Sequence, residues 1–336
     1  MPRTFVNQLT IPGTPVEGVF QIAEKSLRTT KKGTQFITAK VRDRTGEMPA
    51  VMWDATEALF AAIPQDGYAV VKGRVDTFND APQVVIEAMR PARPEEVDLR
   101  DFLPTGPGDP DEQLARLRAI LDEVERPALR ALLDRVWADE RLLADLRRAP
   151  AAQRLHHAYL GGLVEHTLSV VELARLLCRH YPRLDRDLLL VGAFWHDLGK
   201  TRELAYTEAF TYTDAGKLVG HLVQGVLMLE EKIREVREAG EAFPENLAHL
   251  LRHLVLAHHG EHAFGSPKFP MTAEAFALHH LDNLDAKLHA FWRQVEGDAD
   301  PARRWTAWNK MFGGALFKGF EEEDEPGEGA GEEPAP

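Results

Sequence analysis

Histidine is distributed very unevenly along this chain of 336 residues. All 14 histidines lie between His156 and His289, so the first 155 residues contain none. Imidazole is the most frequent metal ligand in proteins and titrates near neutral pH, so a histidine-rich segment is a candidate for metal or proton chemistry. We therefore expect the residues that carry out metal or proton chemistry to lie in the C-terminal half of the protein.

Several histidines and aspartates recur among residues that would otherwise form a helical core. They are His166, His196, Asp197, His221, His258, His259 and Asp282. Imidazoles and carboxylates on facing helices can converge inside a bundle, which is how helical folds form metal sites. Without a metal, inward-pointing polar side chains would remain unpaired at a high cost in free energy. The ordered series therefore predicts a metal centre.

Helical patterns surround every member of this series. From about residue 111 onward, apolar residues recur at the i, i+3, i+4 and i+7 spacing of amphipathic helices. The segments with this spacing are 112–124, 127–137, 140–150, 163–182, 185–200, 221–236, 245–260 and 272–295. We therefore expect an all-α domain over residues 111–320, in which each candidate ligand lies on a helix or at its end.

The N-terminal part has a different pattern. Runs of β-branched and aromatic residues at 16–30, 35–53, 68–78 and 83–89 alternate roughly between apolar and polar, and the second run contains a turn at Thr45-Gly46. A helical segment at 54–64 separates the third and fourth expected strands. Five short strands with a helix in that place are typical of an OB-fold, a small β-barrel. We expect the barrel over residues 1–95 and a linker rich in Pro, Gly and Asp over 96–110.

The polar series also has the order found in a known superfamily. His, His-Asp and Asp, with H-D-L-G-K at 196–200, resemble the HD superfamily of metal-dependent phosphohydrolases. Behind an OB-fold, the chain more closely resembles the YhaM-type 3′–5′ exoribonucleases. The blocks that carry this resemblance are HHAYLGGLVEHT (156–167), FWHDLGK (194–200), GHLVQG (220–225), LAHHG (256–260) and LDNLDAKL (281–288). The resemblance covers nearly the whole chain except for the details of the linker and the acidic tail.

The resemblance implies a pair of metal ions. The ligands of the first would be His166, His196, Asp197 and Asp282, and those of the second would be His221, His258, His259 and the bridging Asp197. A carboxylate can span two cations about 4 Å apart, and such a pair activates water for attack on phosphorus. Asp285 is an alternative to Asp282, since LDNLDAK offers both. Mixed nitrogen and oxygen ligands suit Mn²⁺, and Fe, Co or Ni would fit the same residues.

Lys200 completes the H-D-L-G-K element and has two interpretations. A lysine that ends a helix complements the helix dipole and needs no further role. Alternatively, Gly199 allows a turn that directs the ammonium into the metal pocket, where it would stabilise charge on a pentacoordinate phosphate. We predict this catalytic role for Lys200 together with Asp197. The preceding His156-His157 and Gly161-Gly162 pairs form either a simple turn or a loop on the substrate side.

Charge is distributed as unevenly as histidine, within a net charge of −13. Residues 25–44 hold seven bases and one acid, whereas residues 321–336 hold eight acids and no base. OB-folds bind single strands through a cationic groove and aromatic side chains on which bases stack. The expected nucleic-acid contacts are Lys31, Lys32, Phe36, Lys40, Arg42 and Trp53. We expect the acidic tail over 321–336 to be disordered and to have no binding role.

Two further observations concern the segment after the last predicted helix and the location of the protein in the cell. Residues 302–320 mix bases with aromatic residues, and we expect them to cover the helical core; extension of the nucleic-acid path and a subunit contact are the alternatives. A single cysteine, a start without a signal-peptide core and no run of about 18 apolar residues predict a soluble, cytoplasmic protein.

These patterns predict a metal-dependent exonuclease that hydrolyses single-stranded RNA and releases nucleoside 5′-monophosphates, with single-stranded DNA open as a second substrate. The 3′–5′ polarity and the RNA preference are implied by the resemblance alone. Two alternatives stay open: an HD phosphohydrolase of small nucleotides or cyclic dinucleotides with a regulatory barrel, and a non-enzymatic single-strand-binding factor. Assembly into a homo-oligomer is open as well.

Overall fold

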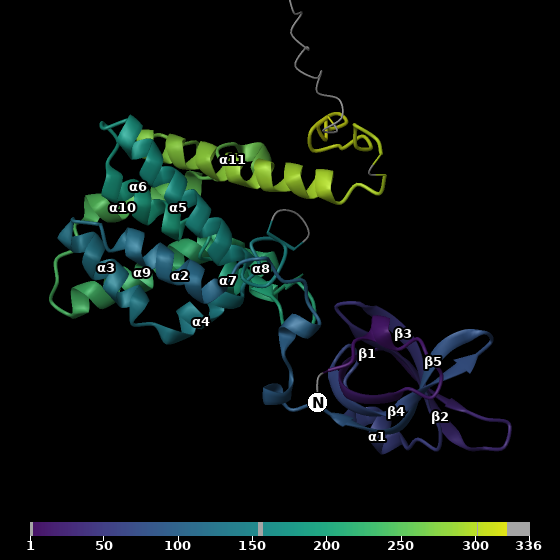
Figure 1. The fold of residues 1–336 in the computed structure, drawn as a ribbon. Coiled ribbons are helices and arrows are strands. Elements are labelled where there is room, and N and C mark those ends of the chain that lie inside the picture. Colours follow the sequence, from purple (N-terminus) through teal and green to yellow (C-terminus); the bar gives the residue numbers. More distant parts are fainter. Residues whose placement is uncertain (1–2, 154–156, 301, 321–336) are drawn as a thin grey trace, which may run out of the picture.

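The chain folds into a small β-barrel followed by a helical domain, as the sequence patterns predict (Figure 1). The computed structural model describes residues 3–153, 157–300 and 302–320. Among these residues, none of the helices combines the length and the apolar character that crossing a membrane requires. The predictions for His156 and for the acidic tail fall outside the described residues.

The barrel is closed by strands in the order β1-β2-β3-β5-β4. Its elements are β1 (Pro15–Thr29), β2 (Gln35–Asp43), β3 (Gly46–Met52), α1 (Glu57–Ala62), β4 (Tyr68–Phe78) and β5 (Ala81–Pro91). The long β1 pairs with both β2 and β4, and its register shifts between Ala23 and Ser26, where Glu24 has a φ of 49°. A bulge of this kind bends a strand, which allows one strand to close the barrel. Phe20, Ile22 and Ile37 fill the interior.

The helical domain places its apolar residues in one core. Its helices are α2 (Pro110–Leu121), α3 (Pro127–Trp137), α4 (Glu140–Arg148), α5 (Gly162–His180), α6 (Arg186–Trp195), α7 (Lys200–Glu203), α8 (Asp214–Val219), α9 (His221–Glu238), α10 (Glu245–Ala257) and α11 (Ala273–Glu296). Phe194 and Trp195 on α6 are fully buried, and leucines of α3, α5 and α10 surround them. The core thus fixes α6 at the centre of the bundle, directly before the His196-Asp197 pair.

One element of the helical domain is not helical. The two-residue strands β6 (Leu204–Ala205) and β7 (Thr211–Tyr212) pair as a short antiparallel ribbon, which helical periodicity does not predict. The loop between them reaches the barrel, where Tyr68 Oη donates to Thr207 O at 2.6 Å and Gln21 Nε2 donates to Glu208 O at 3.2 Å. The ribbon is therefore a point of contact between the two domains.

The expectation that residues 302–320 cover the helical core is wrong. The segment packs against the end of α11, where the ring of Phe312 meets Phe291 at 5.9 Å and Lys318 pairs with Asp298. Trp305, Trp308 and Phe320 are exposed. The helical core is already closed by its own helices, so this segment adds no residue to the core beneath α5, α6 and α10.

Candidate metal centre

The predicted series of histidines and aspartates converges from five helices. His166 lies within α5, Asp282 within α11, and His221 is the first residue of α9. His196 and His258 cap the C-terminal ends of α6 and α10, so Asp197 and His259 are the residues that follow these caps. These helices pack against one another in the bundle, which directs their polar side chains toward one point.

Gly199 is the residue that allows two of these helix ends to meet. A Cβ atom here would lie 2.0 Å from the carbonyl oxygen of His221 and 2.7 Å from the backbone nitrogen of Gly225. The backbone of Gly199 is itself helical, with φ −58° and ψ −21°. Residues 196–199 do form a turn, as expected, but its backbone conformation is open to any residue, so the glycine is required for close approach. That approach brings Asp197 beside His221.

The first cluster surrounds Asp197 Oδ2. His166 Nε2 lies 3.5 Å and His196 Nε2 lies 3.4 Å from this oxygen. Asp282 Oδ1 lies 3.2 Å from His166 Nε2 and 3.8 Å from His196 Nε2. The imidazoles and Asp197 are buried. Two nitrogen and two oxygen atoms thus face a common point.

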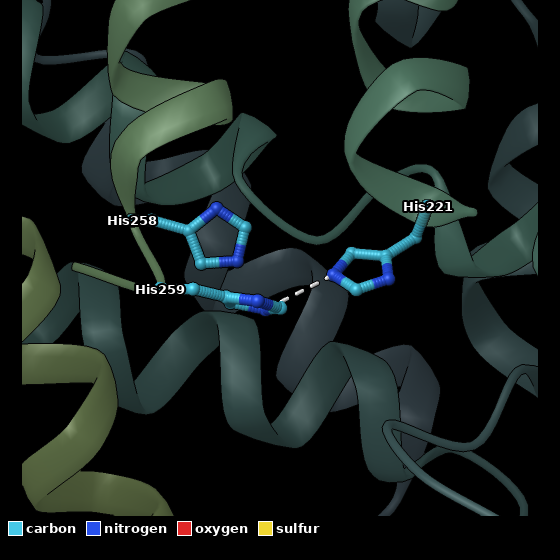
Figure 2. Close-up of side chains that lie close together, drawn as sticks. All are labelled: His221, His258 and His259. Atoms are coloured by element: carbon cyan, nitrogen blue, oxygen red, sulfur yellow. Dashed lines mark hydrogen bonds between the residues drawn. The ribbon is translucent and has the colours of Figure 1, made fainter. Parts of the chain in front are cut away.

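The second cluster surrounds the other oxygen of the same carboxylate. His221 Nε2 and His258 Nε2 lie 3.7 and 3.6 Å from Asp197 Oδ1. His259 Nε2 lies 3.2 Å from His221 Nε2, and Figure 2 shows the three imidazole rings turned toward one another. Their ligand atoms all lie within 4.8 Å of one another, a spacing that could hold one metal ion. Asp197 therefore stands between two groups of imidazoles.

Every imidazole in the clusters has its Nδ1 atom engaged by an oxygen acceptor. The acceptors are Ala193 O for His196 (2.7 Å), Val255 O for His258 (2.8 Å), Phe264 O for His259 (2.9 Å), Asp285 Oδ2 for His166 (2.7 Å) and Glu203 Oε1 for His221 (3.0 Å). Carbonyl and ionised carboxylate oxygens only accept hydrogen bonds, so the proton of each neutral ring is assigned to Nδ1. The Nε2 lone pairs then face the clusters, as metal ligation requires.

The donor set fits divalent metals. Asp197 Oδ1 is buried and meets no hydrogen-bond donor among the described residues. Burial alone would raise the pKa of Asp197, but Lys200 and His196 hold it well below its usual range, so this carboxylate is ionised. A buried anionic oxygen facing imidazole lone pairs is unfavourable unless a cation lies between them. Nitrogen and carboxylate ligands in this mixture suit first-row transition metals.

The pKa values of the histidines differ between the two clusters. Burial lowers the pKa of His258 to about 3 although Asp197 opposes this shift, so its Nε2 is available at neutral pH. Burial acts on His166 in the same direction, but Asp282 and Asp285 outweigh it and raise the pKa to about 10. A metal ion in the first cluster must therefore displace a proton from His166.

We expect the affinity of the first cluster for metal to fall as pH falls. Displacement of one proton predicts a decrease of about tenfold per pH unit between pH 8 and pH 6. Calorimetric titration of metal-stripped protein with Mn²⁺, in buffers that differ in ionisation enthalpy, measures both the affinity and the released proton. A pH-independent affinity with no proton release would contradict the assigned protonation of His166.

Lys200 points its ammonium at the centre. Its Nζ lies 2.6 Å from Asp197 Oδ2, and its side chain is largely buried. Burial alone would lower the pKa of Lys200, but Asp197 raises it, so the side chain is charged. Lys200 is the first residue of α7 rather than the last of a helix. The helix-dipole interpretation therefore does not apply, since a cation at a helix N-terminus is not stabilised by the dipole.

Glu203 is a buried residue of the centre that the sequence analysis missed. Its Oε1 accepts hydrogen bonds from the backbone nitrogen of His221 at 2.9 Å and from Nδ1 of the same residue at 3.0 Å. Glu203 ends the one-turn helix α7, which is too short to show an amphipathic period. Its position three residues after Lys200 was the only signal in the sequence. Glu203 thus orients His221 toward the second cluster.

We expect Glu203→Ala to weaken the second cluster selectively. Loss of a carboxylate that orients a ligating histidine costs about 10- to 100-fold in metal affinity. Metal content after dialysis should therefore fall below that of the unmodified protein, whereas Glu203→Gln, which keeps an acceptor, should lose less. Glu231→Ala is the matched control, because it removes an exposed carboxylate from α9 that pairs with Arg202. Equal metal loss in Glu203→Ala and the control would disprove this role.

Asp285 supports the first cluster instead of entering it. Its Oδ2 accepts from His166 Nδ1, lies 3.2 Å from His157 Nε2, and its Oδ1 accepts from Ser169 Oγ. Asp282, by contrast, faces the Nε2 atoms. The geometry favours Asp282 over Asp285 as the final ligand.

The turn before α5 also contacts Asp285. His157 Nδ1 lies 2.9 Å from the hydroxyl of Tyr159, which donates to Glu165 at 2.8 Å. The ring of His157 also stacks on His289, with centroids 3.8 Å apart. His157 has a φ of 48°, and a Cβ on Gly162 would lie 2.0 Å from its carbonyl oxygen. The described residues of this block therefore hold Asp285 in place through His157. Tyr159 and His289 also take part, and neither was predicted to do so.

The predicted nucleic-acid contacts on the barrel fall into two groups. Lys40 lies 2.7 Å from both Glu24 and Glu47, and Arg42 also pairs with Glu47. Sequence counting could not detect these pairs, because Glu24 and Glu47 lie just outside the basic segment 25–44. The positive charge expected at Lys40 and Arg42 is thus largely compensated within the barrel.

The other predicted contacts, Lys31, Lys32, Phe36 and Trp53, have no such ion pairs with acidic residues among those described. Phe36 and Trp53 lie with ring centroids 5.0 Å apart, and half of Trp53 is exposed. Lys31 and Lys32 are exposed in the turn between β1 and β2. Arg28 on β1 lies directly across from Phe36 on β2 and is also exposed. An aromatic pair flanked by cations has the composition of a platform on which bases stack.

Comparison with known proteins agrees with both domains. Residues 163–287 match the HD domain family, and residues 21–92 match the family described as an OB-fold nucleic acid binding domain. The 3′-5′ exoribonuclease YhaM of Bacillus velezensis is 33% identical over 286 residues, which are 84% of this chain and 88% of that protein. The proteins of the same name from Oceanobacillus iheyensis and Bacillus subtilis are 34% and 33% identical, each over 285 residues that cover 84% of this chain and 88% of the relative.

The predicted resemblance is thereby confirmed. The match of 286 residues is longer than the helical domain alone, so it extends into the barrel and includes the elements that carry both clusters. This chain belongs to the YhaM family of 3′–5′ exoribonucleases.

Proposed function

We propose that the protein is a metal-dependent 3′–5′ exonuclease that hydrolyses single-stranded RNA and releases nucleoside 5′-monophosphates. Single-stranded DNA is proposed as a second substrate. The observation that carries this proposal is the position of Asp197, whose two carboxylate oxygens each face a separate group of imidazoles. Membership of the YhaM family supports the polarity and the RNA preference.

The proposed ligands divide between the two oxygens of Asp197. His166, His196 and Asp282 would hold one divalent ion with Oδ2, and His221, His258 and His259 would hold the other with Oδ1. We propose Mn²⁺ for both, since mixed imidazole and carboxylate ligation suits it, with Fe, Co or Ni as alternatives. Two such ions would supply an activated water and neutralise charge on the phosphate.

The protein side chains prepare this centre for an anion. Asp197 and Asp282 contribute two negative charges against the four positive charges of two divalent ions, and Lys200 adds one more. The surplus positive charge would attract a phosphodiester and its attacking hydroxide. Lys200 Nζ is held by Asp197 next to the first cluster, so its ammonium is preorganised to stabilise charge that develops on phosphate oxygens.

We propose that residues 1–95 capture the strand, that 96–110 link the domains and that 111–320 hydrolyse the terminal bond. The exposed Trp53 and the half-buried Phe36 beside it would stack two bases, while Lys31 and Lys32 would contact phosphates. Binding energy gained on the barrel, far from the reacting bond, would chiefly lower KM for long strands. Lys40 and Arg42 would contribute less to strand binding, because each already pairs with a glutamate of the barrel.

End-labelled RNA tests the proposed activity directly. A 3′-labelled single strand should release its label at once as a mononucleotide, whereas the same strand labelled at the 5′ end should shorten as a ladder. A cyclic dinucleotide serves as the competing substrate. Faster hydrolysis of the cyclic dinucleotide, or release of the 5′ label first, would contradict the proposal.

The aromatic pair gives a separate prediction for binding. Trp53→Ala should weaken binding of a single-stranded oligonucleotide by about tenfold, because stacking of one base on an aromatic side chain is worth about 1–3 kcal/mol. Fluorescence anisotropy measures the Kd. Phe78→Ala is the control, since Phe78 is equally exposed on the barrel but lies at the far end of β4. Equal losses in both variants would remove Trp53 from the binding surface.

A further inference from the structure

His279 lies outside both clusters but contacts the backbone of the second. It is a residue of α11, three positions before Asp282, so the two side chains leave the helix on the same side. Its Nδ1 atom lies 2.8 Å from the carbonyl oxygen of His258. A carbonyl oxygen only accepts hydrogen bonds, so the proton of a neutral His279 ring is assigned to Nδ1, which donates it. His279 thus binds the main chain of a proposed ligand and not its side chain.

This hydrogen bond acts on the peptide group between two proposed ligands. The carbonyl of His258 belongs to the peptide that joins His258 to His259, and both imidazoles face the second cluster. Because a peptide group is planar, a hydrogen bond to its oxygen restrains the orientation of the whole unit. That orientation sets ψ of His258 and φ of His259, which determine how the two side chains diverge from the backbone. His279 therefore restrains the relative direction of the two imidazoles.

The end of α10 explains why a side chain from another helix is needed here. His258 is the C-terminal cap of α10, and the last carbonyl groups of an α-helix have no partner within the helix. Such a group is satisfied by water, by a tighter turn or by a side chain, and here α11 provides the side chain. His279 therefore supplies a hydrogen bond that α10 itself cannot make.

The residue after the two proposed ligands leaves room for the ring of His279. Gly260 has a φ of 78°, in the left-handed region that favours glycine. A Cβ atom at this position would lie 2.3 Å from Cε1 and 2.5 Å from Nδ1 of His279. A larger residue at 260 would therefore displace the imidazole from the carbonyl of His258. The turn that follows the proposed ligands is thus shaped around this one side chain.

We propose that His279 is a positioning residue that holds His258 and His259 in place and connects the second cluster to the first. The connection runs through α11, which also carries Asp282, a residue that faces the first cluster. One helix thus carries a proposed ligand of one metal ion and restrains the peptide between two proposed ligands of the other. This role rests on the two-ion centre proposed above, and it adds a residue that would touch neither ion.

Leucine and asparagine at position 279 separate the hydrogen bond from packing. Asparagine keeps an N–H donor on a nitrogen bonded to Cγ, as Nδ1 is in histidine, whereas leucine keeps apolar bulk and has no donor. We expect His279→Leu to lower the affinity of the full-length protein for Mn²⁺ by about tenfold, as is typical for loss of a group that orients a metal ligand. The value of kcat should fall with it. His279→Asn should stay closer to the unmodified protein in both quantities.

His249→Ala is the matched control, since His249 is an exposed histidine of α10. It should bind Mn²⁺ and hydrolyse RNA as the unmodified protein does. Calorimetric titration of metal-stripped protein, thermal unfolding without metal and kinetics on a labelled oligonucleotide measure the three properties.

Two results would overturn the positioning role and leave the proposed function intact. One is an equal loss of Mn²⁺ affinity in His279→Leu and His279→Asn. The other is a lower unfolding temperature of His279→Leu with unchanged affinity, which would indicate packing alone. An unmodified protein that neither binds Mn²⁺ nor hydrolyses RNA would overturn the proposed function, and this inference with it.

Discussion

Asp197→Ala should reduce kcat for hydrolysis of a labelled RNA oligonucleotide to less than about 1% of the original value, because loss of even one electrostatic contact to the transition state costs about 10²-fold. The substitution removes the carboxylate that faces both clusters, so metal content should fall together with activity. Binding of the oligonucleotide, which we assign to the barrel, should change little. Turnover, metal analysis and fluorescence anisotropy measure the three quantities on one preparation.

The interpretation of this experiment depends on Lys200. In Asp197→Ala the buried ammonium of Lys200 loses its partner, and an unpaired buried charge destabilises a fold strongly. Asp197→Asn keeps an acceptor for Lys200 and removes only the negative charge, so it separates loss of metal from loss of folding. Thermal unfolding of both variants provides the comparison. Retention of more than a few per cent of activity in a folded, metal-loaded Asp197→Asn protein would exclude Asp197 as the bridging ligand.

Lys200→Ala should lower kcat by about 10²-fold while leaving the metal content unchanged, as is typical for the loss of one group that stabilises transition-state charge. The structure places this ammonium 2.6 Å from Asp197 Oδ2, next to the first cluster. The decrease should appear in kcat rather than in KM, because we assign capture of the strand to the barrel. Steady-state kinetics on an oligonucleotide of fixed length separates the two constants.

Lys200→Arg distinguishes charge from geometry. Arginine retains the positive charge but replaces a compact ammonium with a planar fork, so partial recovery of kcat would indicate that charge is the main contribution. Lys217→Ala on α8 is the control for a nearby exposed lysine. If Lys200→Ala lost metal in proportion to activity, Lys200 would be a support for Asp197 and not a group that acts on the phosphate.

Much of the fold was predictable because it follows from periodicity. The alternation along β2 places Ile37 and Val41 in the barrel interior and Phe36 and Lys40 outside, and this pattern is legible in the sequence. The order of the histidines and aspartates was equally legible, since each follows or interrupts an apolar helical pattern. Periodicity therefore identified the elements and the candidate ligands that they carry.

Other features depend on contacts between distant segments, which no local pattern records. Glu203 reaches His221 from a helix of a single turn, and Tyr159 reaches the first cluster through His157 and Asp285. The pairing of Lys40 with Glu24 arises from the bulge in β1 and the curvature of the barrel. A count of bases along the chain overstates the free positive charge of the barrel, because it cannot include partners brought close by folding.

The ribbon formed by β6 and β7 has a mechanical consequence. It begins directly after α7, which carries Lys200 and Glu203, and its loop is hydrogen-bonded to Tyr68 and Gln21 of the barrel. The barrel is thus attached to the helical domain at two points, through the linker and through the segment that separates Asp197 from His221. If the barrel binds the strand as we propose, a pulling force on that strand would reach, through these two hydrogen bonds, the backbone between Lys200 and His221, beside the proposed metal ligands.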